Sequence, residues 1–131
     1  MVIVDSDVWS EAFRSKAPVS KYVKELKRLI DADEVVMIAP IRQEILSGIR
    51  DERMYDELKE QMRAFPSRRV SDKLYELGAL LFNTCRRTGI QGSHTDFLIC
   101  ACSVEWKVQI LSKDKDYHLY EKYIPIELRK L

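Results

Sequence analysis

The chain has 131 residues, of which 46% are hydrophobic and 33% are charged, and its formal net charge is +1. This length is typical of one domain, so we expect residues 1–131 to fold as a single unit. The apolar content argues against a disordered chain, which lacks the apolar surface needed to offset the entropy of ordering. The near-zero net charge argues against a strongly basic nucleic-acid-binding domain, so any contact with nucleic acid must come from local clusters.

The location of the protein is indicated by what the sequence lacks. No apolar run approaches the roughly 18 to 20 residues that span a bilayer, and the first four residues lead directly into Asp5. The three cysteines, Cys85, Cys100 and Cys102, contain no CxxC pair and predict neither a disulfide framework nor a zinc site. We therefore expect a cytoplasmic protein without membrane contact.

The first part of the chain alternates between short apolar runs and helical patterns. A β-branched run at residues 2–4 predicts a buried strand, and Asp7 predicts the cap of a first helix. Pro18 is placed to open a second helix, whose apolar residues recur at three and four positions. A second strand is expected at residues 35–38, followed by a helix that contains Glu44.

Three helices are expected in the middle of the chain. Residues 51–64 have apolar positions at helical spacing within a strongly charged segment, which is typical of a surface helix. A longer helix is expected from Ser71 to a stop at Gly89. Ser93 or His94 is expected to cap a third helix, which is apolar on nearly every side and therefore buried.

The last part of the chain predicts further strands. A third strand is expected at residues 108–111, a helix opens at residues 112–116, and residues 124–128 form a weak edge strand, since proline is tolerated at a sheet edge. Strands that alternate with helices are typical of a parallel sheet covered on both faces. The sequence therefore predicts a three-layer α/β/α fold with a central parallel sheet of four to five strands.

Four acidic residues belong to apolar segments and not to charged surface runs: Asp5, Glu44, Asp96 and Asp114. Asp5 and Asp114 follow predicted strands, and the carboxyl ends of parallel strands share one edge, where ligands bind. Gathering like charges in a partly dry site is costly unless a cation neutralises them. Oxygen-only ligands favour Mg²⁺, with Mn²⁺ as a substitute, and these ions typically support phosphodiester hydrolysis by an activated water.

Four short motifs surround these acids. Residues 4–9 (VDSDVW) join an apolar strand to an Asp and a hydroxyl residue, and residues 42–48 (RQEILSG) carry the Glu. Residues 96–101 (DFLICA) place an Asp before an apolar helix, and residues 110–117 (ILSKDKDY) end in a hydroxyl and an Asp-x-Asp-aromatic pattern. In this order and spacing they resemble the four motifs of PIN-domain proteins of the VapC toxin type. The resemblance runs along nearly the whole chain.

This resemblance implies a PIN-like fold and an endoribonuclease that acts as the toxin of a toxin–antitoxin system. It implies that Asp5, Glu44, Asp96 and Asp114 bind magnesium directly or through water and carry out the catalysis. It further implies a homodimer, an RNA substrate and a cognate antitoxin that occupies the active-site groove. Three residues match the family's supporting positions: Ser6, Ser112 and Asp116.

Some positions depart from the family pattern or carry weaker expectations. Asp7 stands where the family often has a small polar residue, and it adds negative charge beside the site. Arg42 and His94 are candidates for contact with substrate phosphate, although His94 also suits a helix cap and arginines are often solvated surface residues.

Two other functions fit part of the sequence. Asp5 and Asp7 fit the Asp-x-Asp opening of a haloacid-dehalogenase-like phosphatase, in which nucleophile and acid lie two residues apart, but that mechanism does not need Glu44. A PIN fold kept as a non-catalytic binding scaffold is the second alternative. Four mutually repelling carboxylates argue against such an idle site.

Overall fold

The computed structural model describes residues 1–14 and 18–131. Short strands alternate with helices, as the sequence predicts. The elements, in chain order, are β1 (Val2–Val4), α1 (Ser6–Arg14), α2 (Lys21–Asp31), β2 (Val35–Val36), α3 (Ala39–Leu46), α4 (Glu52–Gln61), the 3₁₀ helix η1 (Met62–Ala64), α5 (Asp72–Arg86), α6 (His94–Trp106), β3 (Gln109–Leu111) and α7 (Asp116–Tyr120).

The sheet is parallel and has the strand order β2-β1-β3, which confirms the predicted α/β class. Val2 pairs with Val35 on one side of β1, and Val4 pairs with Leu111 on the other. All three residues of β1 are buried, because a central strand covered on both faces needs apolar side chains throughout. The carboxyl ends of β1 and β3 lie side by side, and this edge positions the candidate site.

The prediction of four to five strands was wrong for the described residues, which form a sheet of three strands. The predicted edge strand at residues 124–128 meets β3 only through a single parallel bridge between Leu128 and Ile110. Ile124 and Ile126 are buried, but Pro125 has no N–H group to donate to a ladder. The apolar residues of this segment therefore indicate burial and not strand pairing.

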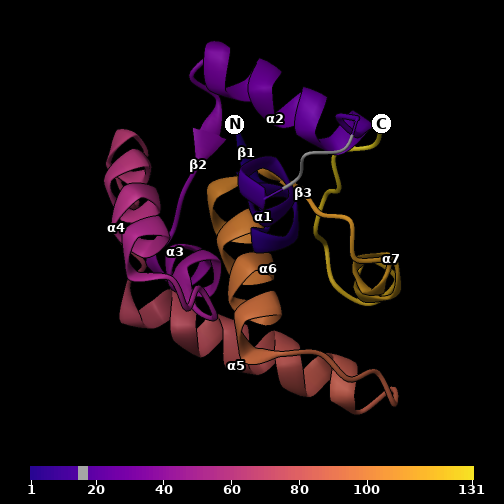
Figure 1. Ribbon diagram of the computed structural model, residues 1–131. Helices are drawn as coiled ribbons and strands as arrows, with labels where there is room; N and C mark the ends of the chain where they lie inside the picture. Colours follow the sequence, from indigo (N-terminus) through magenta and orange to yellow (C-terminus); the bar gives the residue numbers. More distant parts are fainter. Residues whose placement is uncertain (15–17) are drawn as a thin grey trace.

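Helix α6 forms the centre of the packing, as its apolar character predicts. Its residues 97–103 are all buried, and the helix contacts both β3 and α5. In Figure 1, α5 lies along the bottom of the view and α6 rises from it toward the strands. A Cβ added to Gly78 of α5 would lie 3.4 Å from Cα of Leu98, so this glycine allows the two helices to approach closely.

The helix starts differ from the predicted ones in two places. Helix α1 begins at Ser6 and not after Asp7, because the backbone carbonyl of Asp5 already accepts the first-turn hydrogen bonds, from the N–H of Val8 at 3.2 Å and from that of Trp9 at 3.5 Å. Helix α2 begins three residues after Pro18, because Ser20 caps it. Of the two residues predicted to cap α6, Ser93 and His94, the cap is Ser93, whose Oγ accepts from the N–H of Asp96 at 3.0 Å.

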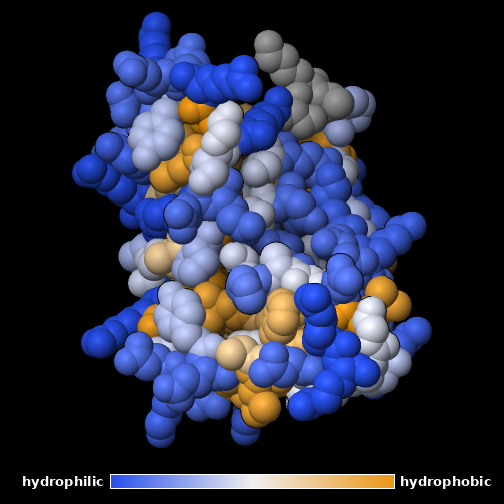
Figure 2. Space-filling view, turned by 90° about the horizontal axis from the view of Figure 1, so that it is seen from below, coloured by the Kyte–Doolittle hydropathy of each residue, from blue (hydrophilic) through white to orange (hydrophobic). Residues whose placement is uncertain are grey.

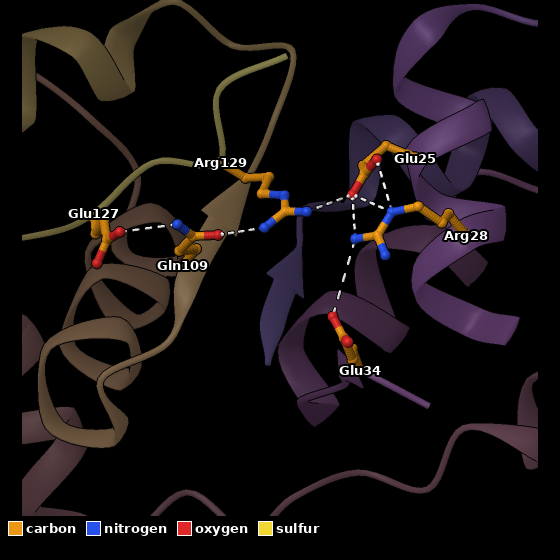
Figure 3. A network of polar contacts seen from close by, with 6 residues as sticks. All are labelled: Glu25, Arg28, Glu34, Gln109, Glu127 and Arg129. Atoms are coloured by element: carbon orange, nitrogen blue, oxygen red, sulfur yellow. Dashed lines mark hydrogen bonds and ion pairs between the residues drawn. The ribbon is translucent and has the colours of Figure 1, made fainter. Parts of the chain in front are cut away.

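A polar network ties the end of the chain to α2 (Figure 3). Arg129 donates one hydrogen bond to Gln109 at 3.1 Å and another to Glu25 of α2 at 3.0 Å. Gln109 in turn donates to Glu127 at 2.8 Å, and Arg28 pairs with Glu25 at 2.7 Å. These contacts hold α2, the start of β3 and residues 127–129 together.

The face of the molecule seen from below is mainly hydrophilic, with separate apolar patches (Figure 2). Leu80 and Met54 are among the large apolar residues that are more than half exposed. Among the described residues, none of the helices combines the length and the apolar character that a bilayer crossing requires.

Candidate active site

Asp5 lies directly after β1 and is the most buried of the predicted site residues, with 7% of its surface exposed. Its Oδ1 accepts from the backbone N–H of Ser6 at 2.8 Å, and its Oδ2 accepts from Oγ of Ser112 at 3.0 Å. Burial raises the pKa of Asp5 to about 7, and the charges of Asp7 and Asp96 add to the rise. This carboxylate is therefore fixed in place within a strongly negative environment.

Glu44 projects from α3 toward the same site. The Oγ of Ser6 donates a hydrogen bond to its Oε1 at 3.3 Å, so Ser6 links the carboxylates of Asp5 and Glu44. Partial burial raises the pKa of Glu44, and the charges of Asp96 and Asp7 contribute further. The structure thus brings Glu44 within electrostatic reach of acids more than 30 positions away in the chain.

Asp96 lies in the first turn of α6 and receives hydrogen bonds from two tyrosines of α7. The phenol of Tyr120 donates to Oδ2 at 3.0 Å, and that of Tyr117 donates to Oδ1 at 3.4 Å. Both rings are buried, and burial raises the pKa of each phenol, with the charge of Asp96 contributing. Both phenols therefore stay protonated and remain donors to this carboxylate.

Asp114 and Asp116 are exposed; Asp114 lies in the turn between β3 and α7, and Asp116 is the first residue of α7. The N–H of Asp114 donates to Oγ of Ser112 at 3.0 Å, and Oδ1 of Asp114 accepts from the N–H of Asp116 at 2.9 Å. Asp114 is therefore placed by the same serine that contacts Asp5. One of its two oxygens is engaged with the backbone of its own turn.

Asp7 is held more firmly than its sequence position suggested. Its Oδ2 accepts from the N–H of Lys113 at 2.9 Å and from Oγ of Ser112 at 3.2 Å. Among the described residues, its Oδ1 is buried without a hydrogen-bond partner. Burial raises the pKa of Asp7. Asp7 thus ties α1 to the loop after β3 while it adds negative charge to the site.

The donor set suits a hard divalent cation. All the candidate donors are carboxylates, which Mg²⁺ and Mn²⁺ prefer. Asp7 has a buried oxygen without a partner among the described residues, and burial together with the charge of Asp7 raises the pKa of Asp5, so a bound cation would stabilise both carboxylates in their ionised form. Within residues 1–14 and 18–131, however, no three His, Cys, Asp or Glu side chains are already oriented around one metal position.

The two candidate substrate-binding residues have other contacts. The guanidinium of Arg42 donates to the carbonyl of Met62 at 3.2 Å, to the carbonyl of Phe65, and to Oγ of Ser67 at 3.3 Å. The ring of His94 stacks on Phe82, with 4.9 Å between the ring centroids. Arg42 thus binds carbonyl groups at both ends of the η1 segment, and the exposed ring of His94, at the start of α6, stacks on a residue of α5.

Sequence patterns missed two contributors to the site. The fourth motif predicts only an aromatic residue at Tyr117, and no motif includes Tyr120, although both side chains donate to Asp96. Their three-residue spacing on a short helix was the available signal, because it puts both side chains on one face. Gly92, which lies against Tyr120, carried no pattern of its own.

Comparison with solved structures identifies the fold. The structure of FitAcB from Neisseria gonorrhoeae matches with a TM-score of 0.79 and 16% identity, over 99% of this chain and 97% of that chain. VapBC2 from Rickettsia felis, bound to a promoter DNA fragment, matches with a TM-score of 0.74 and 17% identity, over 100% and 99%. By its fold, the chain falls in the class of PIN-like α/β proteins that these structures represent.

Comparison with known sequences identifies the family. Ribonuclease VapC11 of Mycobacterium tuberculosis is 30% identical over 121 residues, which are 89% of this chain and 89% of the relative. A VapC ribonuclease of Mycobacterium bovis shows the same identity and coverage. The chain matches no family model. The chain belongs to the VapC ribonuclease family, which confirms the resemblance seen in its motifs.

Proposed function

We propose that this protein is a Mg²⁺-dependent endoribonuclease that hydrolyses RNA phosphodiester bonds and acts as the toxin of a toxin–antitoxin pair. The observation that carries this proposal is the buried carboxylate of Asp5, which Ser6 and Ser112 hold in place beside other acids. Membership of the VapC family supports it, because the named relatives are ribonucleases.

In this proposal Asp5, Glu44, Asp96 and Asp114 hold the metal, directly or through water, and Mn²⁺ can replace Mg²⁺. When bound, the ion supplies an activated water and stabilises the charge that develops on the phosphoryl group. The hydroxyl groups of Ser6 and Ser112 restrict rotation of the acidic side chains. The exposed position of Asp114 leaves one side of the site open to an RNA strand.

The proposed binding partners follow from the proposed role of the protein as a toxin. VapBC2, which shares the fold, is described as bound to a DNA fragment from its promoter. We propose that this chain pairs with a cognate antitoxin that covers the acidic site, and that it forms a homodimer in the cytoplasm. Co-expression with the neighbouring reading frame, followed by size-exclusion chromatography with light scattering, tests both associations.

The activity is tested with antitoxin-free protein and structured RNAs in the presence of Mg²⁺ or Mn²⁺. We expect internal cleavage that EDTA stops and that Asp5→Asn reduces by at least about 100-fold, since removal of a group that only orients a metal's ligands already costs about 10–100-fold. Asp56→Asn, an exposed change on α4, is the matched control and should cleave like the wild type. RNAs left intact by wild-type protein free of inhibitor support the binding-scaffold alternative instead.

Two substitutions distinguish the proposed nuclease from the phosphatase alternative. A haloacid-dehalogenase-like enzyme needs Asp7 as its acid and has no use for Glu44. Our proposal therefore expects Asp7→Asn to retain most RNA cleavage and Glu44→Gln to abolish it. Hydrolysis of p-nitrophenyl phosphate that disappears in Asp7→Asn and persists in Glu44→Gln overturns the nuclease assignment.

A further inference from the structure

The carboxylate of Asp96 is held from α7, an element that follows it by about 20 positions. Tyr120 approaches Oδ2 at 3.0 Å, and Tyr117 approaches Oδ1 at 3.4 Å, so each carboxylate oxygen has its own phenol donor. Hydrogen bonds to an ionised group are shorter and stronger than neutral ones. The Tyr120 contact is the shorter of the two, so we expect it to dominate the orientation of Asp96.

The ring of Tyr120 has little freedom to move away from this carboxylate. It is fully buried, and its centroid lies 4.7 Å from that of Phe97 and 5.3 Å from that of Tyr117, the latter pair in an edge-to-face arrangement. Such packing restricts the side chain to one rotamer. The phenol oxygen is therefore delivered to Asp96 by a rigid aromatic cluster.

Gly92 leaves the space that the Tyr120 phenol occupies. A Cβ at residue 92 would lie 2.8 Å from a ring carbon of Phe97 and 2.9 Å from Cζ of Tyr120, and closer still to the phenol oxygen. Gly92 is not among the glycines with positive φ, so its backbone conformation does not require glycine. Glycine is needed at this position because any side chain would occupy the space taken by the Tyr120 ring.

We propose that Tyr120 is a positioning residue that orients the Asp96 carboxylate for metal binding, and that Gly92 provides the space for it. The inference rests on the proposed function, in which Asp96 is a metal ligand. It goes beyond the shared motifs of the family, because it depends on the contact between α7 and the start of α6. A purely structural role for Tyr120 makes a different prediction, since it affects folding and not affinity for the metal.

The test is the affinity of the purified protein for Mn²⁺, measured by the electron paramagnetic resonance signal of free Mn²⁺ and by calorimetry. Tyr120→Phe keeps the ring and removes the donor, and we expect Mn²⁺ binding about 10-fold weaker than in the wild type. Tyr123→Phe removes a phenol that is 49% exposed and should bind Mn²⁺ normally. Melting temperatures in EDTA show whether Tyr120→Phe remains folded.

Gly92→Ala tests the same contact while Tyr120 itself is left unchanged. The added methyl group must displace Tyr120 or Phe97, so we expect weaker Mn²⁺ binding from this variant as well. In the Tyr120→Phe background the hydrogen bond to Asp96 is already lost, so displacement of the ring by Gly92→Ala should weaken Mn²⁺ binding further by less than twofold. Such non-additivity is the signature of two residues that act through one contact. Additive losses contradict the role assigned to Gly92.

Asp96→Asn separates failure of this inference from failure of the proposed function. If Asp96→Asn loses Mn²⁺ binding while folded Tyr120→Phe binds Mn²⁺ like the wild type, the positioning role is overturned and the nuclease assignment stands. If Asp96→Asn binds Mn²⁺ like the wild type and wild-type protein leaves RNA intact, the proposed function itself fails. A lower melting temperature with unchanged Mn²⁺ affinity in Tyr120→Phe also overturns the inference.

Discussion

The hydroxyl group of Ser112 donates a hydrogen bond to Oδ2 of Asp5 at 3.0 Å, although the two residues are 107 positions apart. The same oxygen lies 3.2 Å from Oδ2 of Asp7 and accepts from the N–H of Asp114 at 3.0 Å. One serine therefore links the end of β1, the first turn of α1 and the turn after β3. Because a hydroxyl carries a single proton, Asp5 and Asp7 share one donor between them.

Ser112→Ala should weaken the site more than the fold. The variant loses the donor to Asp5 and the acceptor for the N–H of Asp114, and we expect RNA cleavage to fall about 10-fold or more. Ser112→Thr keeps the hydroxyl and should retain most of the activity. Ser47→Ala, which removes an exposed hydroxyl bonded to a helix carbonyl, is the control. Equal activity in Ser112→Ala and the wild type would show that the serine contact is dispensable.

The metal-free protein should lose stability as the pH rises through the range in which Asp5 ionises. Burial, followed by the charge of Asp7, raises the pKa of Asp5 from 3.8 to about 7, so the folded state binds a proton more tightly than the unfolded state does. The resulting stabilisation is complete below pH 3.8 and is lost as the pH approaches 7. Its slope reaches about 1.4 kcal/mol per pH unit for one proton.

Asp5→Asn isolates the contribution of Asp5 ionisation to the free energy of unfolding. Urea denaturation in EDTA at several pH values from 5 to 8 gives the free energy of unfolding of both proteins. We expect the variant to gain stability relative to the wild type as the pH increases. Asp56→Asn, with an exposed carboxylate, should follow the wild type throughout. A constant difference between Asp5→Asn and the wild type across this range means that Asp5 does not titrate there.

Arg42→Ala should destabilise the fold, because the guanidinium satisfies two carbonyl groups and a hydroxyl at residues 62–67. Hydrogen bonds from a charged donor contribute about 1.5 to 3 kcal/mol, and we expect a loss of about 2 kcal/mol in the free energy of unfolding. Arg53→Ala, at a side chain that is 89% exposed, is the matched control. Unchanged stability together with weaker RNA binding supports the substrate-binding role expected from the sequence.

Trp9→Ala should be among the most destabilising substitutions in the chain. Trp9 is 1% exposed, donates from Nε1 to the carbonyl of Val4 at 3.1 Å, and lies edge-to-face against Phe65 at 4.9 Å. Removing a buried aromatic side chain costs about 3 to 5 kcal/mol, which chemical denaturation measures directly. Trp106, which is only half-buried, provides the comparison, and we expect a smaller loss from Trp106→Ala.

Local patterns predicted the parts of the fold that local chemistry determines. The β-branched run of β1 and the all-round apolar character of α6 identified two buried segments, and Ser93 identified a helix start. The positions of the four acids at strand ends and helix starts indicated a shared site. The structure brings Glu44 and Asp96 within electrostatic reach of each other, although Asp114 remains exposed in its turn.

The remaining features depend on contacts between segments that are distant in the chain. Nothing near Arg42 indicates that its partners are carbonyl groups more than 20 positions later. Residues 124–128 have the apolar residues of a strand but only one bridge to β3, and the pattern of burial does not distinguish these cases. The role of Gly92 becomes visible only when the ring of Tyr120 is in place.

The central strand has a consequence for how the protein is made. During translation β1 is made before its partner β3 and before the serine that contacts Asp5, both of which follow more than 100 residues later. A nascent chain that is cut short before this point contains the amino-terminal acid but cannot close the pocket around it. The contacts that join Asp5, Ser112 and Asp114 therefore cannot form until synthesis has passed residue 114.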